Sequence, residues 1–362
     1  MVPVQVVQLI QNKKVLIAPL DWGLGHATRC IPIIKQLLQQ QCIVTIAATG
    51  IIRDTLMAEF PLLTYTAIPN YNIKYGYTSL ATTIKYLTQL PKIKRTIQEE
   101  HLWLQQQQQL HNYEIIISDN RFGLYHPTAT TIFITHQLQP LSPLGKLGNM
   151  LLQAINYYYI NKYNQCWVYD SAAPQALAGK LSNPTKLPKV PISYLGNSTR
   201  LQLLPNANLV YKAAIILSGP EPQRTILERI ILTQLSSSAP AEQYPKKIIL
   251  VRGLPSTSQP ITNYNPNITI INYANSLQLN TIIASSQYII CRSGYTSVMD
   301  YLLLHKQCIF IPTPAQSEQQ YLATYCAKKQ WAICYKQDNF NLTAALTKAS
   351  NFPFVTVNYS LV

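Results

Sequence analysis

Apolar runs recur along the first half of the chain, and each is followed by a polar loop and then by apolar residues at helical spacing. The clearest runs are residues 15–20, 42–48, 114–119 and 131–136. Strands buried in a parallel sheet read as continuous apolar runs, whereas half-exposed strands alternate apolar and polar residues. Strands that alternate with helices are typical of βαβ units, so the pattern predicts a doubly wound α/β sheet.

A second series of the same kind begins beyond residue 210. Its apolar runs are residues 213–219, 246–253, 268–274, 288–294 and 308–314. The stretch between the two series is rich in proline, which is typical of connecting segments. We therefore expect a Rossmann-like domain over 1–170, a linker region over 171–210 and a second Rossmann-like domain over 211–362.

Composition adds a preference for anionic partners. The 362 residues carry a formal net charge of +15, spread over both halves of the chain. A basic surface favours nucleotides, phosphorylated sugars or anionic lipids, although it also serves solubility alone. The seven cysteines form no C-x-x-C pair, as expected for reduced thiols in the cytoplasm. The amino terminus lacks a basic segment before its apolar residues, which argues against a signal peptide.

A turn with two glycines and a histidine follows the first apolar run. Gly23, Gly25 and His26 lie where a strand should end and a helix should begin. Open α/β sheets bind ligands at the carboxyl ends of their strands, and a helix amino terminus attracts phosphate. An imidazole placed there can accept a proton near neutral pH, although it can also be a helix-capping residue without chemistry. Thr28 stands where a dinucleotide-binding fingerprint needs its third glycine.

Other polar residues follow the next predicted strands of the same domain. Asp119 ends the run at 114–119 and Asn120 follows it, and His136 ends the run at 131–136. All three would reach the same sheet edge as His26. Asp119 could orient His26 and raise its basicity, as a carboxylate does in a catalytic triad. A simple Asx turn at Asp119 and Asn120 is the alternative.

The second domain carries a denser constellation. Arg292, Ser293 and Gly294 follow a predicted strand and open a helix that contains Asp300. The guanidinium and the free N–H groups suit a phosphate, and the carboxylate suits a ribose diol. Further candidates for the donor site are Gln319, Gln320, Ser218 and Gly219. The glutamine pair could bind sugar hydroxyls, or the segment could be a plain helix start with Ser317 as its cap.

Residues 290–323 resemble the donor-binding half of family 28 glycosyltransferases, which have the GT-B fold. The resemblance extends to the N-acetylglucosaminyltransferases of lipid-linked peptidoglycan precursor synthesis. It rests on Arg292, Ser293, Gly294, Asp300, Pro312, Gln319 and Gln320, together with the first loop of Gly23, Gly25 and His26. It implies two Rossmann-like doubly wound domains that face a cleft. It also implies an inverting, metal-independent transfer from a nucleotide-sugar, often a UDP-sugar, with no cofactor.

Within this resemblance, the second domain would hold the donor and the first the acceptor. His26 and Asp119 would be catalytic, and Gly23, Gly25, Asn120 and His136 would line the acceptor side or a phosphate loop. Asp300 stands where the family usually has Glu, and the loop at Ser218 and Gly219 contains prolines where the family is rich in glycine.

Three other functions stay open at this stage. A nucleotide-sugar 2-epimerase shares the architecture, a non-catalytic relative would bind the nucleotide-sugar only, and a dinucleotide-dependent oxidoreductase is disfavoured by Thr28. No metal-ligand spacing, P-loop or nucleic-acid motif is found in the sequence. The acceptor is unknown and could be lipid-linked. Segments 83–96 and 144–165 could touch the inner face of a membrane or could be ordinary core-facing helices.

Overall fold

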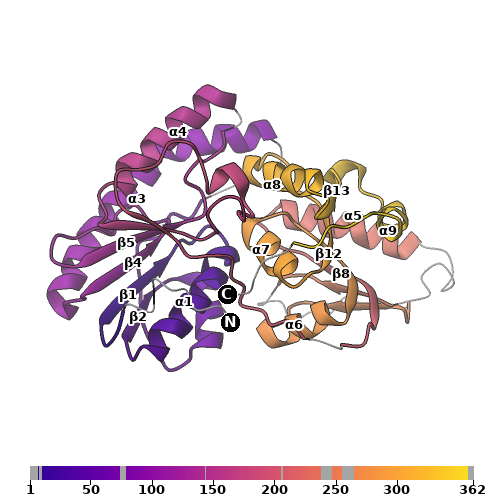
Figure 1. Ribbon diagram of the computed structural model, residues 1–362, viewed down its shortest axis with the longest axis horizontal. Helices are drawn as coiled ribbons and strands as arrows, with labels where there is room; N and C mark the ends of the chain where they lie inside the picture. Colours follow the sequence, from indigo (N-terminus) through magenta and orange to yellow (C-terminus); the bar gives the residue numbers. More distant parts are fainter. Residues whose placement is uncertain are drawn as a thin grey trace. The chain divides into compact units, whose positions relative to one another are not determined.

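The computed structural model describes residues 7, 10–73, 79–142, 144–204, 207–237, 247–254 and 265–357, with the side chains of 79–87 left aside. The chain divides into two compact units, one made mainly of residues up to Arg200 and the other mainly of residues from Leu201. The first unit runs from indigo to magenta in Figure 1, and the second runs from rose through orange to yellow.

Unit 1 is built on a seven-stranded parallel sheet in the order β3-β2-β1-β4-β5-β6-β7. Its strands are β1 (Lys14–Pro19), β2 (Ile43–Ala47), β3 (Thr64–Thr66), β4 (Ile115–Asp119), β5 (Thr130–Thr135), β6 (Gln165–Val168) and β7 (Ile192–Tyr194). The strands from β1 to β5, apart from short β3, are buried over nearly their whole length, as continuous apolar runs require. The chain order reverses between β1 and β4, and this switch point is where doubly wound sheets place their ligands.

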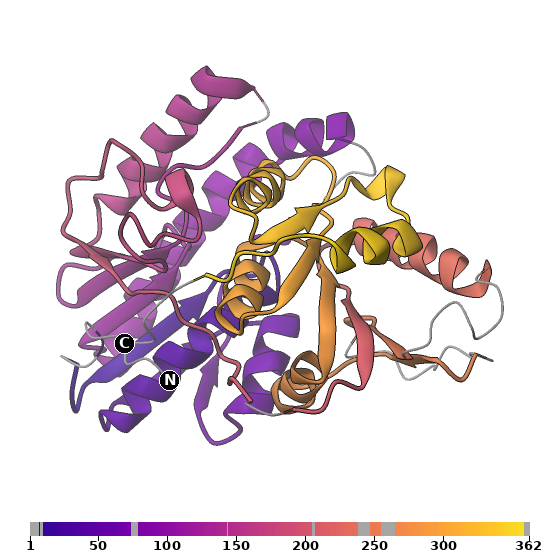
Figure 2. The same cartoon turned by 45° about the vertical axis from the view of Figure 1, so that its right-hand side comes forward.

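Helices cover both faces of this sheet. They are α1 (Leu24–Gln39), α2 (Gly50–Glu59), α3 (Ser79–His111) and α4 (Gly145–Ile160), with a short 3-10 turn at Gly179–Leu181. Leu104 of α3 packs on β1 and β4, and Tyr157 and Ile160 of α4 pack on β5 and β6. Tyr159 of α4 also joins a cluster with Ile97 of α3, so the two helices pack together on the same side of the sheet (Figure 2).

Unit 2 repeats the plan with a six-stranded parallel sheet in the order β10-β9-β8-β11-β12-β13. Its strands are β8 (Tyr211–Ile216), β9 (Lys247–Val251), β10 (Ile268–Ile271), β11 (Ser286–Cys291), β12 (Gln307–Phe310) and β13 (Ala332–Cys334). Its helices are α5 (Gln223–Ser237), α6 (Ser276–Ala284), α7 (Tyr295–Leu303), α8 (Ser317–Lys328) and α9 (Leu342–Ser350), with a 3-10 turn at Gln337–Asn339. One core joins α5 and α9 to the sheet.

The prediction of two doubly wound α/β domains is confirmed, but the expected linker is too long. Residues 171–200 belong to unit 1, because β7 pairs with β6 and extends the first sheet. The carboxylate of Asp170 also holds this stretch, since it accepts hydrogen bonds from the backbone N–H groups of Leu177 and Ala178 and from the Ser182 hydroxyl. The prolines mark an edge strand and its turns, not a flexible connection.

The seven cysteines form no disulfide, which agrees with the expectation of reduced thiols. Six of them are buried and Cys334 is partly buried. Burial raises the pKa of the Cys166 and Cys326 thiols, so these groups are neutral at physiological pH.

Candidate functional site

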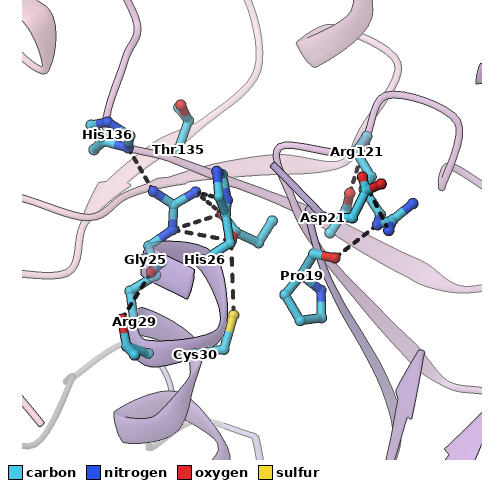
Figure 3. Close-up of polar contacts among 12 residues, drawn as sticks. Pro19, Asp21, Gly25, His26, Arg29, Cys30, Arg121, Thr135 and His136 are labelled. Carbon is cyan, nitrogen blue, oxygen red and sulfur yellow. Dashed lines mark hydrogen bonds and ion pairs between the residues drawn. The ribbon is translucent and has the colours of Figure 1, made fainter. Parts of the chain in front are cut away.

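The register of the central strands brings the predicted residues of unit 1 together. β1 pairs with β4 so that Pro19 lies opposite Asp119, the last residue of β4. The chain leaves β1, turns, and enters α1 at Leu24 with Gly23 as its N-cap. His26 lies in the first turn of this helix, directly over the end of β4 (Figure 3).

A network of four side chains forms at this sheet edge. His26 Nδ1 lies 2.9 Å from Asp119 Oδ2, and Arg29 donates from Nε to both oxygens of Asp119 at 3.0 Å. Arg29 Nη2 is also in short contact with Asp119 Oδ1. Arg29 donates from Nη1 to Nδ1 of His136 at 2.8 Å, so His136 joins the network through the guanidinium (Figure 3). Arg29 is the residue that sequence reasoning missed, although its position one helical turn after His26 could have indicated it.

His26 Nδ1 faces two partners of opposite preference. Arg29 Nη2 lies 2.6 Å from this nitrogen and can only donate, whereas Asp119 Oδ2 can only accept. A neutral imidazole satisfies one of them at a time, so the two groups compete for the tautomer. Within the described residues, His26 uses only Nδ1 in these contacts, which leaves Nε2 as its proton-accepting atom in the Nδ1–H tautomer.

Burial and charge set the protonation states of the network. Burial lowers the pKa of His26, and the Arg29 charge lowers it further, against the opposing effect of Asp119. Burial alone would raise the pKa of Asp119, but Arg29 and His26 outweigh it and the pKa lies below its usual range. The site therefore contains an ionised carboxylate and a neutral imidazole near pH 7.

Asn120 and the following residues form the loop after β4. Asn120 has a positive φ of 56°, a conformation that Asn tolerates better than most residues, and its N–H donates to Ile134 O at 3.1 Å. The next residue, Arg121, is fully buried and donates to Pro19 O at 2.8 Å and to Glu100 Oε1 at 2.7 Å. The loop that begins with Asp119 is thereby tied to β1 and to α3.

Glu100 is a further buried carboxylate of unit 1, and no pattern in the sequence indicated it. Besides Arg121, it accepts hydrogen bonds from the Tyr71 hydroxyl at 2.9 Å and from Gly123 N at 3.0 Å. Burial raises the pKa of Glu100, and Arg121 and these hydrogen bonds counteract it. A Cβ on Gly123 would lie 2.4 Å from Ile97 O, so only glycine fits here. We interpret this cluster as the support of the loop.

In unit 2 the predicted residues meet around the start of α7. Gly294 is the N-cap of α7, and the Ser293 hydroxyl donates to Gln319 O at 2.8 Å. Gln319 Oε1 accepts from Thr313 N at 2.9 Å, which ties the loop after β12 to α8. Asp300 is buried in α7, and Gln320 is exposed in α8. Ser317 does not cap α8, because the N-cap is Gln316 and no side chain caps the helix.

The turn after β8 comes close to the same region. Gly219 has a φ of 105°, which requires glycine, and a Cβ there would lie 3.8 Å from Thr313 Oγ1. Ser218 precedes it and is partly buried. The structure therefore gathers Ser293, Gly294 and Gln319 with the turn at Gly219, along the carboxyl ends of β8, β11 and β12.

Arg292 has a different role from the one that the sequence suggested. Its side chain is buried, and it donates to Ile311 O at 3.1 Å, to Gln223 O at 2.8 Å and to Gln337 Oε1 at 2.6 Å. These acceptors belong to the protein, so the guanidinium holds α5, the end of β12 and the 3-10 turn together. The expectation of a direct phosphate contact is replaced by this structural role.

Comparison with known proteins identifies the second unit. Residues 225–353 match the glycosyltransferase family 28 C-terminal domain. This stretch contains the candidate donor residues from Arg292 to Gln320, and the match agrees with the resemblance noted in the sequence. No curated protein matches the chain.

Solved structures extend the comparison to the whole fold. The glycotransferase of kitacinnamycin is 11% identical, with a TM-score of 0.64, and 95% of this chain and 92% of that one are covered. CalG4, the calicheamicin glycosyltransferase, is 10% identical with a TM-score of 0.64 and coverages of 95% and 90%. Arabidopsis thaliana UGT89C1, complexed with UDP-L-rhamnose, is 13% identical with a TM-score of 0.59 and coverages of 96% and 92%. The chain therefore has the GT-B fold.

Proposed function

We propose that this protein is an inverting glycosyltransferase that moves a sugar from a UDP-sugar or a related nucleotide-sugar to a hydroxyl group of an acceptor. The observation that carries the proposal is the His26–Asp119 pair in a fold whose second unit matches the family 28 domain. A neutral imidazole held by a buried carboxylate is the arrangement that general-base catalysis requires.

In the proposed reaction, Nε2 of His26 takes the proton of the acceptor hydroxyl while the hydroxyl oxygen attacks the anomeric carbon of the donor sugar. The bond between that carbon and the diphosphate oxygen breaks, and the nucleoside diphosphate leaves. Asp119 keeps the Nδ1–H tautomer and stabilises the imidazolium that forms. His26 could instead assist the departing diphosphate, and an acceptor-free measurement of donor cleavage separates the two roles.

The donor would lie on unit 2. Backbone N–H groups at the amino terminus of α7, next to Gly294, suit the diphosphate. Asp300 would accept hydrogen bonds from the ribose, and Gln319 and Gln320 would bind the sugar. We propose that no metal takes part, because the N–H groups at the amino terminus of α7 can stabilise the charge of the leaving diphosphate. Chelator should therefore leave the rate unchanged.

The acceptor side is argued from unit 1. Gly23 has open space around the position of a Cβ, and His136 and Asn120 flank the network of Asp119. Two of the similar structures are of one protein, the spinosyn rhamnosyltransferase SpnG, complexed with spinosyn aglycone and with thymidine diphosphate. By analogy we propose an apolar acceptor, which a lipid-linked compound would satisfy.

Thermal stabilisation by nucleotides tests the donor site. A ligand at 100 times its dissociation constant adds about 2.7 kcal/mol of stability, so UDP, TDP and their sugars can be compared in one panel. We expect one nucleotide class to stabilise the wild-type protein and to lose this effect in Asp300→Asn, but not in Asp338→Ala, which changes an exposed carboxylate of the same unit. Absence of any shift would refute the donor assignment.

Product analysis tests the catalytic step. We expect His26→Ala to retain nucleotide binding and to lose transfer by a factor of about 10²–10⁴, the usual contribution of a general base. Formation of an epimerised nucleotide-sugar without any acceptor would replace the transferase by the 2-epimerase.

A further inference from the structure

Arg29 lies at the centre of the network in unit 1, although the proposed reaction gives it no role. It comes one turn after His26 in α1, so the two side chains share one face of the helix. The Arg29 side chain is only 3% exposed. In Figure 3 its guanidinium lies between His26 and His136. A buried cation this close to a general base changes the chemistry of that base.

Each nitrogen of the guanidinium has an acceptor. Nε donates to both carboxylate oxygens of Asp119 at 3.0 Å, and Nη2 also contacts Oδ1. Nη2 lies 2.6 Å from Nδ1 of His26, and Nη1 donates to Nδ1 of His136 at 2.8 Å. Because Nδ1 of His136 accepts this hydrogen bond, it carries no proton, and the ring adds no second positive charge. Only the planar fork of an arginine reaches all three side chains at once.

The charges at this sheet edge cancel because Arg29 is there. Asp119 is fully buried, and its ionic partners among the described residues are Arg29 and, when protonated, His26. A buried carboxylate without a fixed counter-ion would draw a proton onto the imidazole 2.9 Å away, because an ion pair would then replace an isolated buried charge. With Arg29 present, carboxylate and guanidinium sum to zero and the imidazole can stay neutral.

The other titratable groups around His26 do not supply this positive charge. The thiol of Cys30, on the same helix, is neutral because burial and the neighbouring carboxylate raise its pKa. Asp21 and Arg121, which follow β1 and β4, pair with each other at 3.7 Å (Figure 3). His136, directly after β5, accepts from the same guanidinium. The protonation of His26 therefore depends on the balance between one carboxylate and one guanidinium.

We propose that Arg29 is a positioning residue of the sugar transfer: it cancels the charge of Asp119 and so keeps His26 a neutral proton acceptor on the acid side of pH 7. A histidine that is already protonated cannot take the proton of an acceptor hydroxyl. Asp119 alone would orient the ring but would also favour its protonated form, and Arg29 removes that preference. This role deepens the proposed function and rests on it, because it concerns the base of that reaction.

NMR titration of the histidine rings tests the charge effect without any substrate. The chain has six histidines, and the signal that His26→Gln removes belongs to His26. In the wild-type protein we expect His26 to titrate below its ordinary pKa of 6.5. In Arg29→Gln its pKa should rise by about 1–3 pH units, the usual effect of one neighbouring charge. Arg29→Lys restores the charge and should reverse most of this rise.

The pH profile of transfer separates this role from a purely structural one. The pH below which kcat/KM falls should be higher in Arg29→Gln by the same amount of about 1–3 pH units. The loss relative to the wild type should therefore be about fivefold or more larger at about pH 5.5 than at about pH 9. The matched control is Arg95→Gln, which changes an arginine of α3 whose side chain is 80% exposed and should alter neither the profile nor the titration.

The two measurements fail separately. Absence of transfer by the wild-type protein refutes the proposed function, whereas the titration still decides the charge effect of Arg29. An unchanged pKa of His26 in Arg29→Gln, an equal rise in Arg29→Lys, or a loss of transfer that is the same at every pH would overturn the role of Arg29.

A second background keeps the test available if Arg29→Gln does not fold. In Asp119→Asn the loss of Arg29 no longer leaves a buried carboxylate uncompensated. Adding Arg29→Gln to this variant should again raise the pKa of His26, because a neighbouring positive charge is removed. An unchanged pKa in this pair of variants would equally overturn the proposal.

Discussion

Acidification should destabilise unit 1 through His26. The pKa of His26 is lowered in the folded protein, chiefly by burial and then by Arg29, whereas the unfolded chain has the ordinary value of 6.5. Below pH 6.5, therefore, the imidazole of His26 is protonated in the unfolded chain but stays neutral in the folded protein. The full contribution of the neutral imidazole to stability is present above the pKa of His26 in the unfolded chain. It is lost as the pH falls from that value toward the lower pKa of His26 in the folded protein. Between about pH 7.5 and about pH 5.5 the free energy of unfolding falls by up to about 1.4 kcal/mol, the limit for one proton that only the unfolded chain binds.

Urea unfolding at several pH values measures this effect. Trp331 is the only tryptophan beyond residue 200, so a Trp331→Phe background leaves the three tryptophans of unit 1 as fluorescent probes. In this background we compare His26 with His26→Gln. The matched control is His111→Gln, which changes an exposed histidine at the end of α3.

We expect the His26→Gln variant to lose less stability on acidification than the parent, and the His111→Gln variant to follow the parent. The reasoning fails if His26→Gln keeps the parent's full loss between these pH values. It also fails if the parent gains stability over His26→Gln at the lower pH, because Asp119 would then hold a proton on His26 more strongly than burial and Arg29 oppose it.

Two pairs of variants test whether Glu100 and Gly123 support the loop after β4. Glu100→Ala should cost about 3–5 kcal/mol in urea unfolding, because it leaves the buried charge of Arg121 without its carboxylate. The neighbouring Glu99→Ala should cost no more than about 1 kcal/mol, since Glu99 pairs with Arg95 on the surface; equal costs would contradict the assignment. Gly123→Ala should cost about 1–3 kcal/mol through its clash with Ile97 O, whereas Gly23→Ala, with open space around it and an extended backbone, should stay within about 0.5 kcal/mol.

The fold could be predicted from the sequence because its main signals are local. A parallel sheet buried on both faces requires continuous apolar strands, and the runs at 15–20 and 114–119 became β1 and β4. The stretch 171–200 could not be assigned in this way. Its order depends on β7, only three residues long, and on the buried carboxylate of Asp170, whose partners no hydrophobic pattern reveals.

The site was predictable where the topology alone brings residues together. His26 and Asp119 follow strands that the switch point makes neighbours, and their hydrogen bond follows from that register. Arg29 was missed although it lies one helical turn after His26. Glu100 was not predictable, because burial decides its partners and helical periodicity does not reveal a buried charge. Arg292 was assigned to a ligand for the same reason: the sequence shows the guanidinium but not the carbonyl groups that surround it.

The buried thiols make this protein a reporter of its own local opening. A neutral thiol shielded from solvent reacts with an alkylating reagent only during the moments when its surroundings open. Cys30 lies 3.9 Å from Asp119 Oδ2, and burial and that carboxylate raise its pKa further. Its rate of modification therefore records how often the amino-terminal half of α1 separates from β4. In unit 2, the modification rates of Cys291 in β11 and Cys308 in β12 record how often the surroundings of these strands open.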